Sequence, residues 1–170
     1  MSSACPVDEI VSRMERFLLQ RDRAESEARD YMKRRRLCAP EDVDAVVLRL
    51  YDLGWLNEAR FARERVLYRQ RAGYGPAYIR SELMRLGLPS EVVADALEAA
   101  ADDFAIAVRE VLDRKLRGSQ KLVGNQRERW YHWLRRRGHS IDLARKMVDE
   151  LGLVGESDLH EPAEESFYDE

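Results

Sequence analysis

The chain has 170 residues, of which 45% are hydrophobic, and its net charge is −3. This size suits one domain or an array of small units. No apolar run approaches the roughly 20 residues that a membrane span needs, and the first residues lack the basic start and apolar stretch of a signal peptide. Cys5 and Cys38, the two cysteines, suit neither a disulfide framework nor a zinc site. We therefore expect a cytoplasmic protein that does not enter a membrane.

The first third of the chain predicts three helices. Apolar residues at helical spacing predict the first over about 7–20 and the second over about 24–36. The third starts at Pro40, because proline suits an early helical position and the acidic residues after it lie near the positive end of the helix dipole. Gly54 ends this helix.

The middle third predicts three more helices. Asn57 is a good N-cap for a helix that reaches about Arg71. The segment 73–76 reads Gly-Tyr-Gly-Pro and predicts a turn, since glycine tolerates a positive φ and proline opens the helix that follows, over 76–86. A sixth helix starts at Ser90 and continues to about residue 101.

The last third predicts helices seven to nine. The seventh begins near Asp102 or Asp103 and stops near Gly118, and a loop to about residue 125 precedes the eighth, which reaches about Arg137. Ser140 caps the ninth, which ends near residue 151. No alternating strand pattern with turn residues on both sides appears.

A six-residue block recurs at a fixed distance along the chain. Residues 32–37, 83–88 and 134–139 lie 51 positions apart, and each block is followed by a Pro or Ser start and an apolar helix. Such a period indicates an array of repeated units. We predict an all-α protein of three tandem three-helix repeats that form an elongated, curved array, with repeats at 1–54, 55–101 and 102–153 and an acidic, disordered tail at 154–170.

Several segments resemble the RecX family. Residues 54–62 resemble that family's block of glycine, an aromatic residue, leucine, an acidic pair, any residue, arginine and phenylalanine, with Asn57 where an Asp is common. Residues 71–83 look like the family's most recognisable segment. Residues 21–29 are similar to its N-terminal block, with Ala24 and Ala28 in place of the usual Ser and Leu. The resemblance covers about residues 15–151, and it is specific in the two central blocks.

RecX proteins are bacterial regulators of the RecA recombinase. The resemblance implies tandem three-helix repeats, binding in the groove of the RecA–DNA filament, and inhibition of strand exchange and of coprotease activity. Whether this chain inhibits or stimulates RecA stays open. Single-stranded or duplex DNA is an expected partner, weakly or through RecA, and we expect a monomer that needs no cofactor.

Arginine runs near helix ends and one displayed tyrosine are the candidate contacts with RecA or DNA. Arginines supply salt-dependent affinity for phosphates and acidic surfaces, although cations at a helix C-terminus also favour its dipole. Tyr74, between two glycines, is either displayed or packed across the helix junction, and Trp130 with Leu134 is expected in the core. The candidates are Arg34, Arg35, Arg36, Arg71, Tyr74, Arg80, Arg127, Arg129, Arg135, Arg136 and Arg137.

Charge is distributed unevenly toward the end of the chain. Residues 155–170 hold seven acidic residues and no Lys or Arg, whereas residues 104–148 hold 12 Lys and Arg against four acidic residues. The acidic tail is either a solubilising terminus or a competitor of DNA or RecA for the basic third repeat.

Catalysis has no candidate residues in this sequence. The histidines lack metal-site spacing, and no P-loop, dinucleotide fingerprint or nucleophile elbow is present. His139 occupies the repeat position of Leu37 and Leu88 and is expected to pack there. We therefore expect a protein that is not an enzyme. The alternative to a RecA regulator is a helix-turn-helix DNA-binding repressor, although no obvious recognition helix is present.

Overall fold

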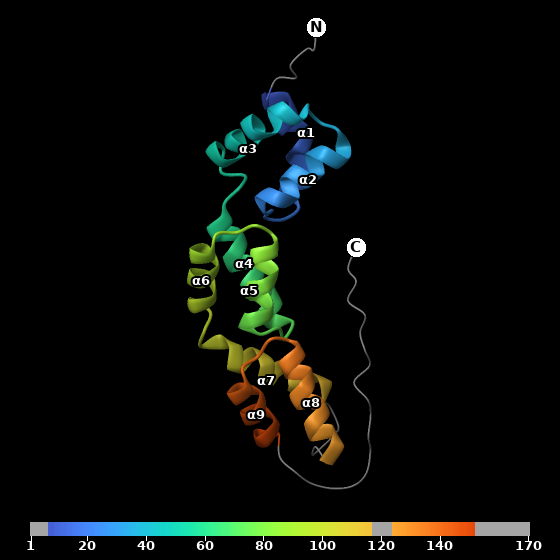
Figure 1. The fold of residues 1–170 in the computed structure, drawn as a ribbon, viewed down its shortest axis with the longest axis vertical. Coiled ribbons are helices and arrows are strands. Elements are labelled where there is room, and N and C mark those ends of the chain that lie inside the picture. Colours follow the sequence, from blue (N-terminus) through green and yellow to red (C-terminus); the bar gives the residue numbers. More distant parts are fainter. Residues whose placement is uncertain (1–6, 117–123, 152–170) are drawn as a thin grey trace. The chain divides into compact units, whose positions relative to one another are not determined.

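The computed structural model describes residues 7–116 and 124–151, and every regular element in these ranges is a helix (Figure 1). The predicted all-α class is confirmed, and the nine predicted helices occur in the predicted order. The elements are α1 Val7–Leu19, α2 Glu25–Arg35, η1 Pro40–Asp42, α3 Val43–Asp52, α4 Glu58–Arg71, α5 Pro76–Arg85, α6 Ser90–Glu98, α7 Asp103–Lys115, α8 Gly124–Arg136 and α9 Ile141–Glu150.

Small differences occur at helix ends. The third predicted helix begins as a 3₁₀ turn at Pro40 before α3 proper, and α6 ends at Glu98 rather than near residue 101. The predicted stop of the seventh helix near Gly118, and the acidic tail over 154–170, lie outside the described residues. No described helix is long and apolar enough to cross a membrane.

The chain divides into two compact units. The first comprises residues 1–68 and 79–101, and the second comprises residues 69–78 and 102–170. The end of α4, the start of α5 and the turn between them therefore belong to the second unit. The repeat boundaries at 54 and 101 stay a prediction, as does the elongated, curved arrangement of the repeats.

In the first unit, α1 and α2 both pack against α3. Ile10, Met14, Met32, Val46 and Leu50 are almost fully buried and form the centre of this core. A second buried set lies on α4, α5 and α6 and includes Phe61, as the sequence predicts. The predicted N-cap of α4 is confirmed, because the backbone N–H of Arg60 donates to Oδ1 of Asn57 at 2.8 Å.

In the second unit, α8 packs against α9. Val108, Leu112, Trp130, Leu134 and Val148 are buried together, so the predicted core role of Trp130 and Leu134 is confirmed. The predicted Ser140 cap is also confirmed: its Oγ accepts a hydrogen bond from the backbone N–H of Leu143 at 3.1 Å.

All three blocks of the 51-residue repeat have the same backbone ending, which α3 and α4 also have at Gly54 and Gly73. Arg36, Gly87 and Gly138 follow α2, α5 and α8 and have φ values of 50°, 86° and 84°. In each case this residue's N–H donates three residues back, and the next N–H donates five residues back, at 3.0–3.3 Å. This is the Schellman arrangement, which satisfies the last carbonyls of a helix.

Buried side chains accompany each of these endings. The acceptors of the five-residue bonds are Met32, Leu83 and Leu134, and the donors are Leu37, Leu88 and His139; all six side chains are buried. A helix that ends in this way places an apolar contact between the residues on both sides of the left-handed position. The sequence repeat therefore corresponds to a repeated local structure.

Candidate partner-binding surface

An exposed arginine precedes each of the three repeated helix endings. Arg34, Arg85 and Arg136 lie two residues before the left-handed position, and all three side chains are exposed. Arg34 and Arg136 are among the predicted contacts, whereas Arg85 is not. The signal that could have identified Arg85 is the same 51-residue offset, applied to the arginine itself rather than to runs of arginines.

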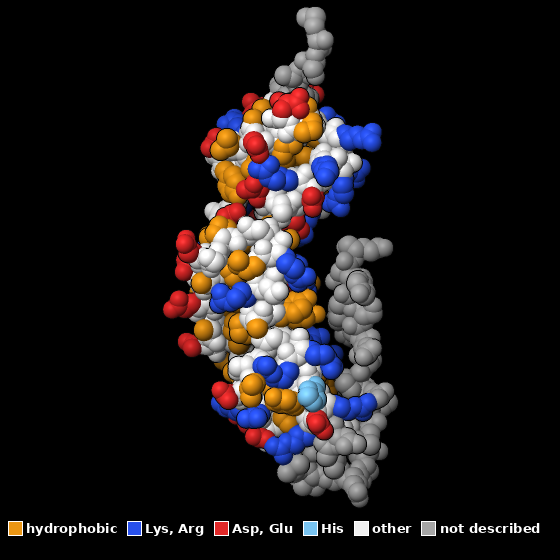
Figure 2. All heavy atoms as spheres, viewed as in Figure 1, with side chains coloured by type: hydrophobic (Ala, Val, Ile, Leu, Met, Phe, Trp, Pro, Cys, Tyr) orange, Lys and Arg blue, Asp and Glu red, His pale blue; other side chains and the backbone are white. Residues whose placement is uncertain are grey.

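The arginine run at the end of α2 is open to solvent. Arg34, Arg35 and Arg36 are exposed, and the guanidinium of Arg35 lies 5.9 Å from the centre of the Tyr31 ring. Figure 2 shows Lys and Arg side chains gathered beside α2. These three predicted contacts therefore lie together at one helix end.

Charges of opposite sign separate between α5 and α6. The predicted contact Arg80 lies on α5 and is exposed, as is Arg85. The exposed acidic residues Glu91, Asp95 and Glu98 lie on α6, and Figure 2 shows acidic side chains along the edge of the molecule where Figure 1 labels α6. An anionic partner would therefore approach the α5 side of this pair of helices.

The turn at residues 73–76 packs against the end of α8 within the second unit. The N–H of Gly75 donates to the carbonyl oxygen of Arg137 at 2.7 Å, and the N–H of Ala77 donates to that of Gly138 at 3.2 Å. A Cβ on Gly75 would lie 2.5 Å from the carbonyl carbon and oxygen of Gly138. Gly75 is therefore required for close approach of two backbones, a role of glycine that does not depend on positive φ.

Tyr74 is half-buried in a stack of rings and guanidinium groups. Its ring centre lies 4.4 Å from that of Tyr78, and the guanidinium groups of Arg137 and Arg69 lie 4.5 and 5.2 Å from it. Cation–π and ring stacking contacts of this kind stabilise the arrangement. The ring therefore packs at the junction and is half-buried, and its display to a partner stays a prediction.

Arg137 is held by contacts within the protein. Its Nη1 donates to the carbonyl oxygen of Ala72 at 2.7 Å, and its guanidinium lies 4.2 Å from the Trp133 ring centre as well as over Tyr74. Half-burial and these contacts give it a structural role that the sequence run did not reveal. Its predicted contact with a partner stays a prediction.

His139 provides a polar contact at a position where the other repeats have leucine. The side chain is 2% exposed, and its Nε2 lies 3.0 Å from the carbonyl oxygen of Gly73. Because a carbonyl can only accept, Nε2 carries the proton in this contact. Burial lowers the pKa of His139, the bond to Gly73 opposes that shift, and the charge of Arg137 lowers the pKa further. Packing of His139, as predicted, is confirmed; its hydrogen bond is an additional finding.

The remaining candidates are distributed over α4 and α8. Arg71 is exposed, and its carbonyl accepts a hydrogen bond from Arg114 at 3.4 Å. Arg129 and Arg136 are exposed on α8, and exposed Arg135 donates to the carbonyl oxygen of His139. Arg127 forms an ion pair with Asp149.

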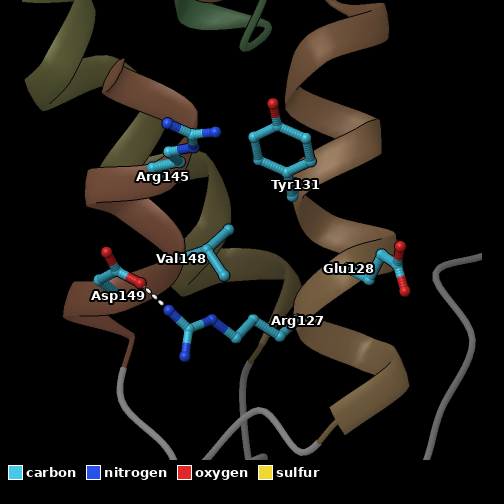
Figure 3. A pocket seen from close by; sticks show the side chains of 6 residues that line it. All are labelled: Arg127, Glu128, Tyr131, Arg145, Val148 and Asp149. Carbon is cyan, nitrogen blue, oxygen red and sulfur yellow. Dashed lines mark hydrogen bonds and ion pairs between the residues drawn. The ribbon is translucent and has the colours of Figure 1, made fainter. Parts of the chain in front are cut away.

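A pocket of about 320 Å³ opens between α8 and α9 (Figure 3). Its lining combines an aromatic ring, an aliphatic side chain and charged groups, from Arg127, Glu128, Tyr131, Arg145, Val148 and Asp149. Within the part of the chain that the structure describes, no group of three or more His, Cys, Asp and Glu could hold a metal ion.

Comparison with known proteins agrees with these features. The family model described as "RecX, second three-helix domain" matches residues 57–97. The chain is 34% identical over 119 residues to the regulatory protein RecX of Pseudomonas savastanoi pv. phaseolicola, covering 70% of this chain and 77% of that protein. It is 31% identical over 129 residues to the regulatory protein RecX of Yersinia enterocolitica, covering 64% and 77%.

The fold is similar to that of a solved structure from this group. The crystal structure of RecX from Lactobacillus salivarius superimposes with a TM-score of 0.68 at 19% identity, over 85% of this chain and 96% of that one. This structural similarity, at 19% identity, supports the fold alone. Family membership rests on the sequence identity to the RecX protein of Pseudomonas savastanoi, which covers most of both chains. The chain therefore belongs to the RecX family of regulatory proteins.

Proposed function

We propose that the protein regulates a RecA recombinase in the bacterial cytoplasm by binding in the groove of the RecA–DNA filament. Occupation of the groove would obstruct strand exchange, repressor access or filament growth, so inhibition is the expected effect. The protein would act as a monomer and without catalysis of its own. Membership of the RecX family supports regulation, and the relatives are named regulatory proteins.

One observation supports the proposed binding mode. An exposed arginine occurs at the same position of the same helix ending in all three repeated blocks, at Arg34, Arg85 and Arg136. A filament groove is itself periodic and contains phosphates, and repeated cations suit such a target. The arginines at these helix ends also interact with the helix dipole, an effect of roughly 0.3–1 kcal/mol each. A binding experiment is therefore needed to separate the two roles.

The test is charge reversal at the three repeated positions. A variant with Arg34→Glu, Arg85→Glu and Arg136→Glu should lose at least about tenfold in affinity for the RecA–DNA filament, equivalent to about 1.4 kcal/mol. Inhibition of DNA-dependent ATP hydrolysis and of strand exchange should weaken in parallel. Filament affinity should also fall as salt is raised, since released counterions drive phosphate contacts.

The matched control reverses three other exposed arginines. Arg13 and Arg16 on α1 and Arg63 on α4 are exposed and lie outside the three repeated blocks. Their replacement by glutamate gives the same change in net charge and should leave filament affinity within about twofold. Equal losses in both variants would show that only net charge matters.

The helix-turn-helix repressor makes a different prediction. Such a protein binds a particular duplex sequence, and this binding persists when random duplex is added in excess. A gel-shift competition with excess random duplex separates the two functions. Sequence-specific duplex binding that is indifferent to RecA would overturn the proposed function.

A further inference from the structure

The pocket between α8 and α9 has an apolar floor and, within the residues that the structure describes, one cation without an ion pair. Val148 and the ring of Tyr131 both line it, and Figure 3 places the guanidinium of Arg145 beside Tyr131. At the opposite end, Arg127 and Asp149 neutralise each other in an ion pair. The carboxylate of Glu128 projects away from Val148 (Figure 3). Among the described residues, none forms an ion pair with Arg145, which is exposed.

These features define the chemistry of a matching ligand. An aromatic side chain fits against Val148 and Tyr131, where it would bury apolar surface and stack on a ring. A carboxylate beside that aromatic group would pair with Arg145, and charge-assisted hydrogen bonds of arginine to carboxylates are the strong class. The ligand is therefore a short acidic segment with an aromatic residue among its carboxylates.

The chain itself contains a segment of this kind a short distance along the sequence after α9. Residues 164–170 read Glu-Glu-Ser-Phe-Tyr-Asp-Glu, which places two aromatic residues between acidic pairs. Arg145 lies about 9 Å along the helix axis before Leu151, at a rise of about 1.5 Å per residue. Residues 152–163 can span up to about 40 Å when extended. The connection is thus several times longer than the return to the pocket requires.

We propose that residues 164–170 dock into the α8–α9 pocket of the same chain, with Phe167 or Tyr168 over Val148 and a neighbouring carboxylate on Arg145. The local charge favours this contact, since residues 155–170 carry seven acidic residues and residues 104–148 an excess of eight positive charges. Docking covers part of the basic surface of α8 and so acts as an internal competitor of anionic partners. The inference does not depend on the proposed function, because its test contains neither RecA nor DNA.

The experiment follows the methyl resonances of Val148 by NMR in the full chain. Replacing both aromatic residues, Phe167→Ala with Tyr168→Ala, should shift the Val148 signals while other core methyl signals stay in place. Arg145→Ala should move them in the same direction. The matched tail control, Leu159→Ala with His160→Ala, removes comparable side chains outside the acidic aromatic segment and should leave Val148 unchanged.

A synthetic peptide of residues 161–170 then tests the contact in trans. Added to the Phe167→Ala, Tyr168→Ala protein, it should return the Val148 signals to their wild-type positions, with affinity about tenfold weaker when Arg145→Ala is also present.

Identical Val148 signals in the wild-type and aromatic-to-alanine proteins would overturn the proposal. So would equal binding of a peptide with the same residues in scrambled order, since charge alone would then suffice. Wild-type Val148 signals that depend on protein concentration would assign the docking to a second chain and overturn the intrachain contact.

Discussion

Gly75 and Arg137 are joined by a backbone hydrogen bond, in which the Gly75 N–H donates to the Arg137 carbonyl oxygen at 2.7 Å. This bond connects the turn after α4 to the end of α8 inside the second unit. The turn is also the segment that resembles RecX proteins most specifically. Its two glycines therefore serve the packing of the second unit, and Tyr74 is presented on a backbone that α8 holds in place.

The second unit should be less stable in the Gly75→Ala variant. The added Cβ would lie 2.5 Å from the carbonyl carbon and oxygen of Gly138 and 2.6 Å from the backbone nitrogen of His139. Backbone atoms cannot move aside as a flexible side chain can, so we expect a loss of about 3 kcal/mol in the free energy of unfolding, at the upper end of overpacking costs. Urea denaturation monitored by tryptophan fluorescence and far-UV circular dichroism measures it.

Gly54→Ala is the control for this substitution. Gly54 has a φ of 72°, and a Cβ there meets nothing within 4 Å. Only the left-handed backbone is penalised, so the cost should be about 1 kcal/mol. Equal costs at the two positions would contradict the backbone clash at Gly75.

Stability should fall as the pH is lowered from about 7.5 to 5.5, and His139 should cause part of the fall. Burial lowers the pKa of His139 in the folded state below its usual value of about 6.5. The unfolded chain therefore takes up a proton first, which stabilises the unfolded state as the pH drops through about 6.5. The stability that His139 contributes is fully present above that pH and is lost as the pH falls toward the lower pKa of His139 in the folded state.

Two histidine variants separate this effect from the titration of other groups. His139→Leu introduces the residue type of Leu37 and Leu88 and should flatten the pH dependence of the free energy of unfolding between pH 7.5 and 5.5. His132→Gln changes an exposed histidine and should leave the slope as it is. An unchanged slope in His139→Leu would show that His139 does not contribute.

Glu82→Gln should destabilise the first unit by about 2 kcal/mol. Glu82 on α5 is buried and accepts from Nε of Arg65 on α4 at 2.8 Å and from its Nη2 at 2.5 Å. Neutralising the carboxylate leaves a partly buried guanidinium without its counter-charge, which costs more than the loss of an exposed pair. Thermal and urea denaturation measure the change.

The exposed pair of Asp8 and Arg49 provides the comparison. These side chains form an ion pair at 2.9 Å and are 76% and 42% exposed. Asp8→Asn should cost less than about 1 kcal/mol, as exposed pairs usually do. A Glu82→Gln protein as stable as Asp8→Asn would show that the Arg65–Glu82 pair is fully compensated by solvent.

Local features of the fold could be predicted from the sequence because they depend on residues a few positions apart. Asn57 and Ser140 cap their helices as expected, and Trp130 and Leu134 are buried at helical spacing. The 51-residue offset also predicts that Gly87 and Gly138 occupy equivalent positions. Each of these inferences uses only periodicity, capping or alignment of the chain with itself.

Contacts between distant segments could not be predicted in this way. The sequence predicts one group of arginines at residues 135–137, yet Arg137 turns back to the carbonyl oxygen of Ala72 while Arg136 is exposed. The direction of a side chain at a helix end depends on the segment that packs against it. For Arg137 that segment contains Ala72, which lies 65 residues away in the sequence. For the same reason, the pairing of Glu82 with Arg65 and of His139 with Gly73 appears only in the structure.

Arg36→Gly should stabilise the protein by about 0.5–1 kcal/mol. Arg36 has φ 50° and ψ 48° in the left-handed conformation that glycine adopts at the two equivalent positions. Glycine removes the Cβ strain of about 1–2 kcal/mol, although the unfolded chain gains entropy and takes back part of that gain. The two capping hydrogen bonds use backbone N–H groups and persist in the variant. Urea denaturation shows whether the free energy of unfolding rises or falls in the variant.

The same substitution separates stability from partner contact, because it removes a predicted binding arginine while it relieves strain. A more stable Arg36→Gly protein with weaker affinity for the RecA–DNA filament would assign Arg36 to the interface. Arg34→Ala, two residues earlier and within the regular helix, should leave stability within about 0.5 kcal/mol and provides the matched loss of charge. A less stable Arg36→Gly protein would mean that the interaction of the Arg36 charge with the end of α2 outweighs the backbone strain.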